Sequence, residues 1–206
     1  MSKVLILDDR KDRKKTLLSD NELLALNSFE KNGVLAFQES LSLINGDLPK
    51  SKEDFNMLLS NYEVIAIHRS WLEQNGISNG FEEYISANPD KNFIIFSGGT
   101  STTRLTNHHR RLSVNAGVFY SSRLIAFIQD ISSGNLPSLL EFLYGKSWKL
   151  PLLLEYRNLL WNNKLISEEE KEEELRELID ETSNGVLTMD YIDSQIKDEI
   201  LNYTLQ

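Results

Sequence analysis

Polar side chains suited to catalysis or ligand binding follow directly after short apolar runs of the sequence. Asp8 and Asp9 follow the first run, His68 follows the third and Ser97 follows the fourth. Because parallel strands end at one edge of their sheet, we expect these side chains to lie close together. A carboxylate pair suits a divalent cation, and the glycine N–H groups after Ser97 suit an anion. The pattern therefore indicates metal or phosphate chemistry at one sheet edge.

Each of these positions also has a purely structural interpretation. The aspartate pair can cap the next helix and pair with Arg10, Lys11 or Arg69, and we keep this interpretation open beside metal binding. For His68 we favour a hydrogen-bonded residue at the sheet edge over a phosphoacceptor. For the Ser-Gly-Gly-Thr-Ser segment at residues 97–101 we favour a strand-to-helix turn over an anion site.

Strand and helix patterns alternate along the part of the chain that carries these residues. The strand patterns are continuous apolar runs, typical of strands buried on both faces. They occupy residues 3–7, 34–37, 64–67, 93–96 and 117–120. Helical patterns fill the intervals, including one helix over residues 10–32 and an amphipathic helix over residues 122–131. This alternation predicts an α/β fold with a five-stranded parallel sheet and helices on both faces.

The sequence changes character after residues 132–136. Beyond them every pattern is helical, and Ser167 with Glu170 is predicted to form a capping box before an acid-rich helix. We therefore predict two regions: an α/β domain over residues 1–132 and an acidic, all-helical C-terminal region over residues 137–206.

Charge and composition exclude several classes of protein. The net charge is −9, and residues 151–206 carry all of it, with 5 basic and 14 acidic residues. Such a segment repels phosphate groups, which disfavours nucleic-acid binding. The chain has no cysteine, which excludes disulfides, zinc–thiolate sites and thiol catalysis. Neither a signal peptide nor an apolar stretch long enough for a membrane span is evident, so we expect a cytoplasmic protein without membrane contact.

The order of these motifs resembles the response-regulator receiver family over about residues 1–132. The resemblance is carried by four segments, each placed at a predicted strand. They are Val-Leu-Ile-Leu-Asp-Asp at residues 4–9, Val-Ile-Ala-Ile-His at 64–68, Ile-Ile-Phe-Ser-Gly at 94–98 and Asn-Ala-Gly-Val-Phe-Tyr at 115–120. The resemblance implies a receiver-like, flavodoxin-like sheet.

The resemblance also implies which residues would form the phosphorylation pocket. Asp8 and Asp9 match the acidic pair that binds Mg²⁺, and Ser97 matches the hydroxyl after the fourth strand. The phosphoacceptor aspartate is replaced by His68, and the lysine after the fifth strand falls at about Ser121 or the next serine. With the acceptor and the lysine changed and a third carboxylate missing, we expect weak Mg²⁺ binding at most, no other cofactor and no phosphorylation.

A cluster of basic residues precedes the fifth predicted strand, where receivers contact their partners. It consists of Arg104, His108, His109, Arg110 and Arg111. We interpret it as an interaction surface for a protein partner, with the chain's own acidic helices or a second copy as the structural alternative.

Three functions remain open from the sequence. The leading one is a non-catalytic signalling or adaptor protein, a pseudo-receiver that acts through protein–protein contacts, with homo-oligomerisation as an option. The second is a metal-assisted phosphohydrolase or nucleotide-handling enzyme built on the aspartate pair, His68, Ser97 and Thr100, although no Walker A sequence is present. The third is a DNA-binding regulator that uses Arg110 and Arg111, which the acidic tail disfavours.

Overall fold

The computed structural model describes residues 3–101, 103–106 and 110–145, together with positions 167, 169, 170 and 173. The chain divides into two compact units, Met1–Phe142 and Leu143–Gln206. The candidate site lies in the first unit.

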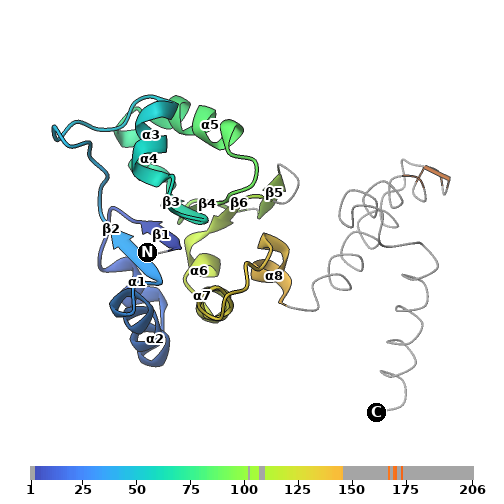
Figure 1. The fold of residues 1–206 in the computed structure, drawn as a ribbon. Helices are drawn as coiled ribbons and strands as arrows, with labels where there is room; N and C mark the ends of the chain where they lie inside the picture. Colours follow the sequence, from blue (N-terminus) through green and yellow to red (C-terminus); the bar gives the residue numbers. More distant parts are fainter. Residues whose placement is uncertain are drawn as a thin grey trace, which may run out of the picture. The chain divides into compact units, whose positions relative to one another are not determined.

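A six-stranded sheet forms the centre of the first unit (Figure 1). Its spatial order is β2, β1, β3, β4, β6 and β5. The strands are β1 (Val4–Leu7), β2 (Leu35–Gln38), β3 (Val64–His68), β4 (Asn92–Ser97), β5 (Arg104–Thr106) and β6 (Arg111–Asn115). Five strands run parallel, and β5 pairs with β6 in the antiparallel sense at one edge. The parallel strands, counted along the chain, lie in the order 2-1-3-4-5, which is the flavodoxin-like order.

The predicted α/β fold with a mostly parallel sheet is confirmed, but the strand count and the position of the last parallel strand were wrong. The sheet has a sixth strand, β5, and residues 117–120 do not belong to the sheet. They lie mostly in helix α6 (Ala116–Phe119), because Asn115 ends β6 and its Oδ1 accepts a hydrogen bond from the N–H of Gly117 at 2.8 Å. This side-chain cap starts a helix where the apolar run suggested a strand.

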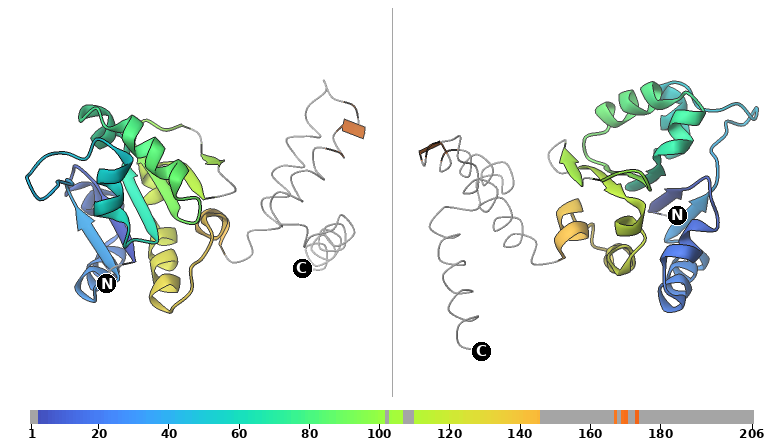
Figure 2. Two further views of the ribbon diagram at one scale, coloured as in Figure 1. Left: turned by 45° about the horizontal axis from the view of Figure 1, so that its top comes forward. Right: turned by 180° about the vertical axis from the view of Figure 1, so that it is seen from behind.

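Helices cover both faces of the sheet, as predicted. Figure 1 shows α3 (Lys52–Leu59), α4 (Arg69–Gln74) and α5 (Ser78–Ala87) over one face. The other face carries α1 (Arg13–Leu17), α2 (Asp20–Lys31) and α7 (Ser122–Ser132), which Figure 2 shows from two further directions. Both faces are therefore buried, which explains why β1 and β3 are continuous apolar runs with every residue buried.

The predicted helix over residues 10–32 is two helices with a break at Ser19. Ser19 has extended backbone dihedrals and forms a capping box with Glu22, so α2 begins afresh there. The preceding α1 has only five residues, none of them buried, and no side-chain cap. Two of its residues contact the rest of the domain: Arg13 faces the aspartates, and Lys14 Nζ lies 3.7 Å from Glu30 Oε2 and 4.0 Å from the centroid of the Phe37 ring.

A short helix continues the first unit beyond the predicted boundary at residue 132. This helix, α8 (Leu139–Tyr144), buries Phe142, whose ring lies 5.4 Å from that of Phe127 and 6.2 Å from that of Phe119. Residues 146–166 and most later positions of the predicted helical region lie outside the described residues. The capping box predicted there is confirmed, since Ser167 N donates to Glu170 Oε2 at 2.7 Å and Glu170 N donates to Ser167 Oγ at 3.2 Å. No helix in the described part of the chain is long and apolar enough to span a membrane.

Candidate functional site

The carboxyl ends of β1 and β3 bring the three most prominent candidates together. Leu7 pairs with Ile67 across the two strands, so Asp8 and His68 are neighbours at the sheet edge. Asp8, Asp9 and His68 each offer one ligand atom, and these atoms lie within 4.8 Å of one another. The fold thus brings side chains that are 60 positions apart in the chain, those of Asp8 and His68, close together at this edge.

Asp8 is a fully buried carboxylate with all its partners supplied by the chain. Its Oδ1 accepts a hydrogen bond from Arg10 N at 3.0 Å, and its Oδ2 accepts one from the Tyr120 hydroxyl at 2.8 Å. Arg13 Nη1 lies 3.1 Å from Asp8 Oδ1. Burial raises the pKa of Asp8, and the hydrogen bond from Tyr120 opposes that rise most strongly. The pKa of the Tyr120 hydroxyl is raised well above its usual value by burial and by the neighbouring carboxylate.

Asp9, Ser70 and His68 form a short hydrogen-bonded relay. Ser70 Oγ donates to Asp9 Oδ2 at 2.9 Å, so its oxygen is left to accept from His68 Nδ1 at 2.6 Å. We therefore assign the neutral ring the tautomer with hydrogen on Nδ1. The same nitrogen lies 3.1 Å from Asp9 Oδ1. His68 is thus the hydrogen-bonded edge residue that we favoured.

The imidazole of His68 is neutral at physiological pH. Burial lowers its pKa to about 4, the positive charge of Arg13 adds to the fall, and Asp9 opposes it. The 3.1 Å contact between His68 Nδ1 and Asp9 Oδ1 is therefore not a pair of opposite charges.

Arg13 supplies the positive charge of the site. Its Nη1 lies 3.1 Å from Asp8 Oδ1 and its Nη2 lies 3.6 Å from Asp9 Oδ1, so one guanidinium faces both carboxylates. The side chain is 13 % exposed. The sequence interpretation named Arg10, Lys11 and Arg69 as partners of the aspartates. Arg10 contributes only its backbone N–H, while its guanidinium pairs with Asp12.

Ser97 and the segment after it form a second feature of the same edge, one strand further along. Ser97 Oγ accepts a hydrogen bond from Gly99 N at 3.3 Å, and Asn115 Nδ2 donates to the carbonyls of Gly98 at 3.2 Å and Thr100 at 2.9 Å. Among the described residues no hydrogen bond joins Ser97 to Asp8, Asp9 or His68. The segment is a turn held by Asn115, as predicted, but it connects β4 to the strand β5 and not to a helix. Among the described residues the buried hydroxyl of Thr100 has no hydrogen-bond partner.

Ser121 does not occupy the position after the last parallel strand, because that strand is β6 and ends at Asn115. Ser121 instead caps α7: its Oγ accepts from Arg123 N at 3.3 Å and donates to Val118 O at 2.8 Å. Asn115, and not Ser121, therefore lies at the end of the last parallel strand. The change follows directly from the misplaced fifth strand.

The basic cluster of the sequence is divided among different partners. Arg111 forms two hydrogen bonds with Glu82 of α5, at 2.6 and 2.5 Å, and Arg110 Nη1 donates to Asn92 Oδ1 at 3.2 Å. Arg104 is exposed on β5. His108 and His109 lie outside the described residues. Arg111 is thus committed to a structural ion pair, and Arg104 and Arg110 remain as the accessible members.

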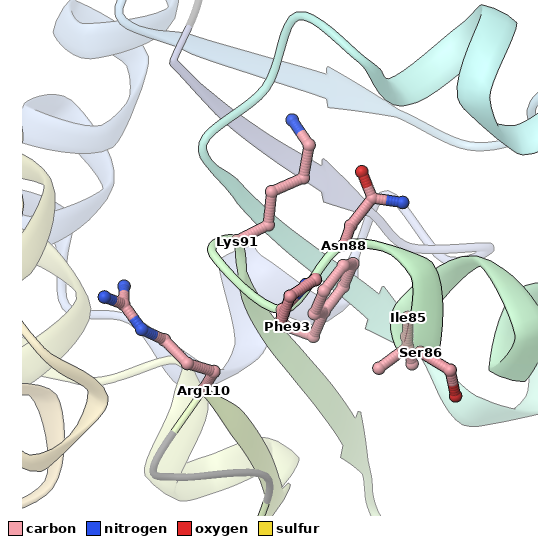
Figure 3. Close-up of a pocket in the computed structure, with 7 residues that line it drawn as sticks. Ile85, Ser86, Asn88, Lys91, Phe93 and Arg110 are labelled. Carbon is pink, nitrogen blue, oxygen red and sulfur yellow. The ribbon is translucent and has the colours of Figure 1, made fainter.

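A separate hollow of about 310 Å³ lies at the opposite end of β4 from the carboxylates. Figure 3 shows its lining, which comes from the end of α5, the following loop and the residue before β6. The lining residues are Ile85, Ser86, Asn88, Pro89, Lys91, Phe93 and Arg110. Lys91 Nζ is directed to the backbone carbonyls of Ser60 and Tyr62, so Arg110 is the cation left facing the hollow. No carboxylate lines it, and it is distinct from the candidate site.

Three residues of the candidate site were not identified from the sequence as its members: Arg13, Ser70 and Tyr120. Each reaches the aspartates through the fold, and Tyr120 is 112 positions away from Asp8. Only Ser70 could have been found from the sequence, because it lies two residues after His68.

Comparison with models of known protein families, with curated proteins and with solved structures finds no match to this chain.

Proposed function

We propose that this protein is a non-catalytic signalling or adaptor module, a degenerate receiver-like domain that acts through protein–protein contacts. The observation that carries the proposal is the state of His68 at the end of β3. This position would have to accept a phosphoryl group, and it holds a buried, neutral imidazole whose Nδ1 is engaged by Ser70 and Asp9. The proposal rests on the flavodoxin-like strand order together with this substitution.

Two further features support the absence of phosphoryl transfer. Charge that develops on a transferring phosphoryl group needs a metal ion and a nearby cation. The end of β6, where a lysine would serve, carries Asn115, and its side-chain amide is occupied with backbone carbonyls. The acidic pair is engaged with Arg13. The charges of the acidic pair are therefore balanced within the chain, which supports a function carried by the surface.

Incubation of the intact protein with acetyl phosphate and Mg²⁺, followed by intact-mass spectrometry, tests the proposal. We expect no phosphorylated species, while an active receiver domain in the same reaction serves as the positive control. A partner captured from the native host should be recovered equally with and without acetyl phosphate. A stable phosphorylated form of this chain would overturn the proposal.

A metal-assisted phosphohydrolase is the second candidate, favoured by the convergence of two carboxylates and one imidazole within 4.8 Å. It requires that the unmodified protein bind a divalent cation at this trio and hydrolyse a phosphate ester. Assay of a generic phosphomonoester with Mg²⁺ or Mn²⁺ distinguishes the two candidates, and Asp8→Ala is the control for any activity found.

A further inference from the structure

We propose that Arg13 is a resident cation, which occupies the place of a metal ion between Asp8 and Asp9 and masks a latent divalent-cation site. The inference deepens the proposed function and rests on it in one respect, namely that the pocket is closed to Mg²⁺-dependent phosphorylation. The inference names the guanidinium of Arg13 as the group that keeps a divalent cation out of the pocket.

Charge balance explains why a cation must lie here. Asp8 has no exposed surface and Asp9 is the next residue, so two carboxylates meet in a poorly hydrated position. A buried carboxylate that lacks a positive neighbour is strongly destabilised in its charged form. Within the described residues Arg13 is the cation in contact with both carboxylates.

The geometry indicates replacement of a metal ion instead of an ordinary surface ion pair. Arg13 presents one nitrogen to each aspartate, at 3.1 and 3.6 Å, so a single group bridges the pair as a metal ion would. Asp9 Oδ1 and Arg13 Nη1 are both buried and neither makes a hydrogen bond of good geometry. The bridge is thus electrostatic and lacks the parallel, two-bond fit that arginine makes with a single carboxylate. The carboxylates keep the open lone pairs that a metal ion would take.

The donor set determines which ion would replace the guanidinium. Two carboxylate oxygens and one imidazole nitrogen suit Mn²⁺ or Zn²⁺ better than Mg²⁺, which prefers oxygen ligands alone. Coordination through Nδ1 of His68 would require its hydrogen to move to Nε2, which leaves the ring neutral. Ser70 would then keep its hydrogen bond to Asp9.

Departure of Arg13 from the carboxylates has a structural consequence at α1. The helix is five residues long with no buried side chain, and Arg13 is its first residue. The guanidinium is therefore one of two anchors of α1, the other being Lys14, whose Nζ lies 3.7 Å from Glu30 Oε2 and 4.0 Å from the centroid of the Phe37 ring. A metal ion at Asp8 and Asp9 would require the Arg13 side chain to move away, while the contacts of Lys14 would still hold α1.

Mn²⁺ binding to the full-length protein tests the inference, with Arg13→Gln as the informative variant and Arg10→Gln as its matched control. Arg10 is a nearby arginine whose exposed side chain pairs with Asp12 and not with the site. Titration followed by the electron paramagnetic resonance signal of free Mn²⁺ should show weak binding by the unmodified protein and by Arg10→Gln. Arg13→Gln should bind roughly tenfold more tightly or better. Addition of Asp9→Asn to Arg13→Gln should abolish the gain, and Mg²⁺ should give a much smaller one.

Several outcomes would overturn the inference. Equal and measurable Mn²⁺ binding by the unmodified protein and a folded Arg13→Gln would show that the guanidinium does not occupy the cation position. No Mn²⁺ binding by either protein would show that the trio is no metal site. If the variant is unfolded alone, Mn²⁺ but not Mg²⁺ should restore its far-ultraviolet circular dichroism, and failure to do so also contradicts the inference. A phosphorylated species would count against the proposed function, whereas tight Mn²⁺ binding by the unmodified, unphosphorylated chain would count only against the role of Arg13.

Discussion

The pair of buried tyrosines, Tyr120 and Tyr84, shows how one hydroxyl can stabilise the domain while another costs stability. Both are almost completely buried. Tyr120 donates to the carboxylate of Asp8 at 2.8 Å, whereas the hydroxyl of Tyr84 is buried with no hydrogen-bond partner among the described residues. Burial alone raises the pKa of Tyr84 to about 12. The two hydroxyls differ because Tyr120 replaces its lost hydrogen bond to water with one to Asp8, whereas Tyr84 does not replace it.

Tyr120→Phe and Tyr84→Phe should therefore have opposite effects. Loss of the Tyr120 hydroxyl removes one partner of a buried carboxylate and should lower the free energy of unfolding by about 1–3 kcal/mol. Loss of the Tyr84 hydroxyl removes an unsatisfied polar atom and should be neutral or stabilising by about 1 kcal/mol. Urea unfolding of the two variants and the unmodified protein measures both changes. An equal loss of stability in both variants would contradict the assigned roles.

His68 gives the domain a specific dependence on pH. Its folded-state pKa of about 4 lies below the ordinary value of 6.5, so the unfolded state binds more protons between these values. The contribution of His68 to the free energy of unfolding is therefore fully present above pH 6.5 and is lost as the pH falls toward 4. Between pH 7.5 and pH 5.5 the loss should be roughly 1 kcal/mol.

Comparison of the unmodified protein with His68→Gln isolates this effect. The variant has no titrating group at position 68, and every other group is shared. Urea unfolding at pH 7.5 and 5.5 should show a smaller loss of stability on acidification in His68→Gln than in the unmodified protein. The raised pKa of Asp8 acts in the opposite direction and is present in both proteins. Equal losses would mean that His68 is protonated normally in the folded state.

At the scale of elements, the packing of α5 depends on a close approach at Gly80. A Cβ atom added there would lie 2.1 Å from the carbonyl oxygen of Lys50, which belongs to the backbone before α3. The two helices form one layer over the sheet (Figure 1). The contact between backbone and helix therefore sets how closely α5 approaches α3.

Gly80→Ala should lower the free energy of unfolding by about 1–3 kcal/mol, because the backbone of Lys50 must move to admit the methyl group. Gly98→Ala is the control, since a Cβ there meets nothing within 4 Å and the backbone φ is not positive. Thermal or urea unfolding of the two variants should separate them clearly. A Gly80→Ala protein as stable as the unmodified one would show that α5 is free to shift.

The elements that the sequence predicted correctly are those whose local pattern decides their structure. Residues 4–7 and 64–68 are continuous apolar runs buried on both faces, and the helix over residues 122–131 has a regular apolar stripe. The apolar run at residues 117–120 was wrongly assigned to a strand, because the side chain of Asn115 caps the backbone there and starts a helix. Strand β6 was missed because its buried residues alternate with exposed or half-buried ones and follow a basic stretch.

The same distinction separates the predicted part of the candidate site from the rest. Asp8, Asp9 and His68 could be found because each follows a strand, and parallel strands end together. Arg13 and Tyr120 could not, because their contacts depend on where α1 and the end of α6 pack against the sheet. A local pattern does not contain that information, and Tyr120 in particular was assigned to a strand that does not exist.

At the scale of the whole molecule, the extent of the first unit decides where the chain can be shortened. The unit reaches Phe142, ten residues beyond the predicted end of the α/β domain. Helix α8 begins with its own capping box between Ser138 and Glu141 and buries four apolar side chains. These are Leu139, Leu140, Phe142 and Leu143. The helix therefore packs its Phe142 ring against Phe119 and Phe127 of the first unit.

A chain ending at residue 145 should fold cooperatively, whereas a chain ending at residue 132 should be markedly destabilised. The shorter chain exposes Phe119 and Phe127, which lose their ring contacts with Phe142, and each large apolar side chain left exposed costs about 1.5–3 kcal/mol. Thermal unfolding followed by circular dichroism should give a sharp transition for the longer chain. The shorter chain should show a lower and broader transition, with increased binding of a hydrophobic dye. Equal transitions for the two chains would place α8 outside the cooperative core, and the boundary at residue 132 would then stand.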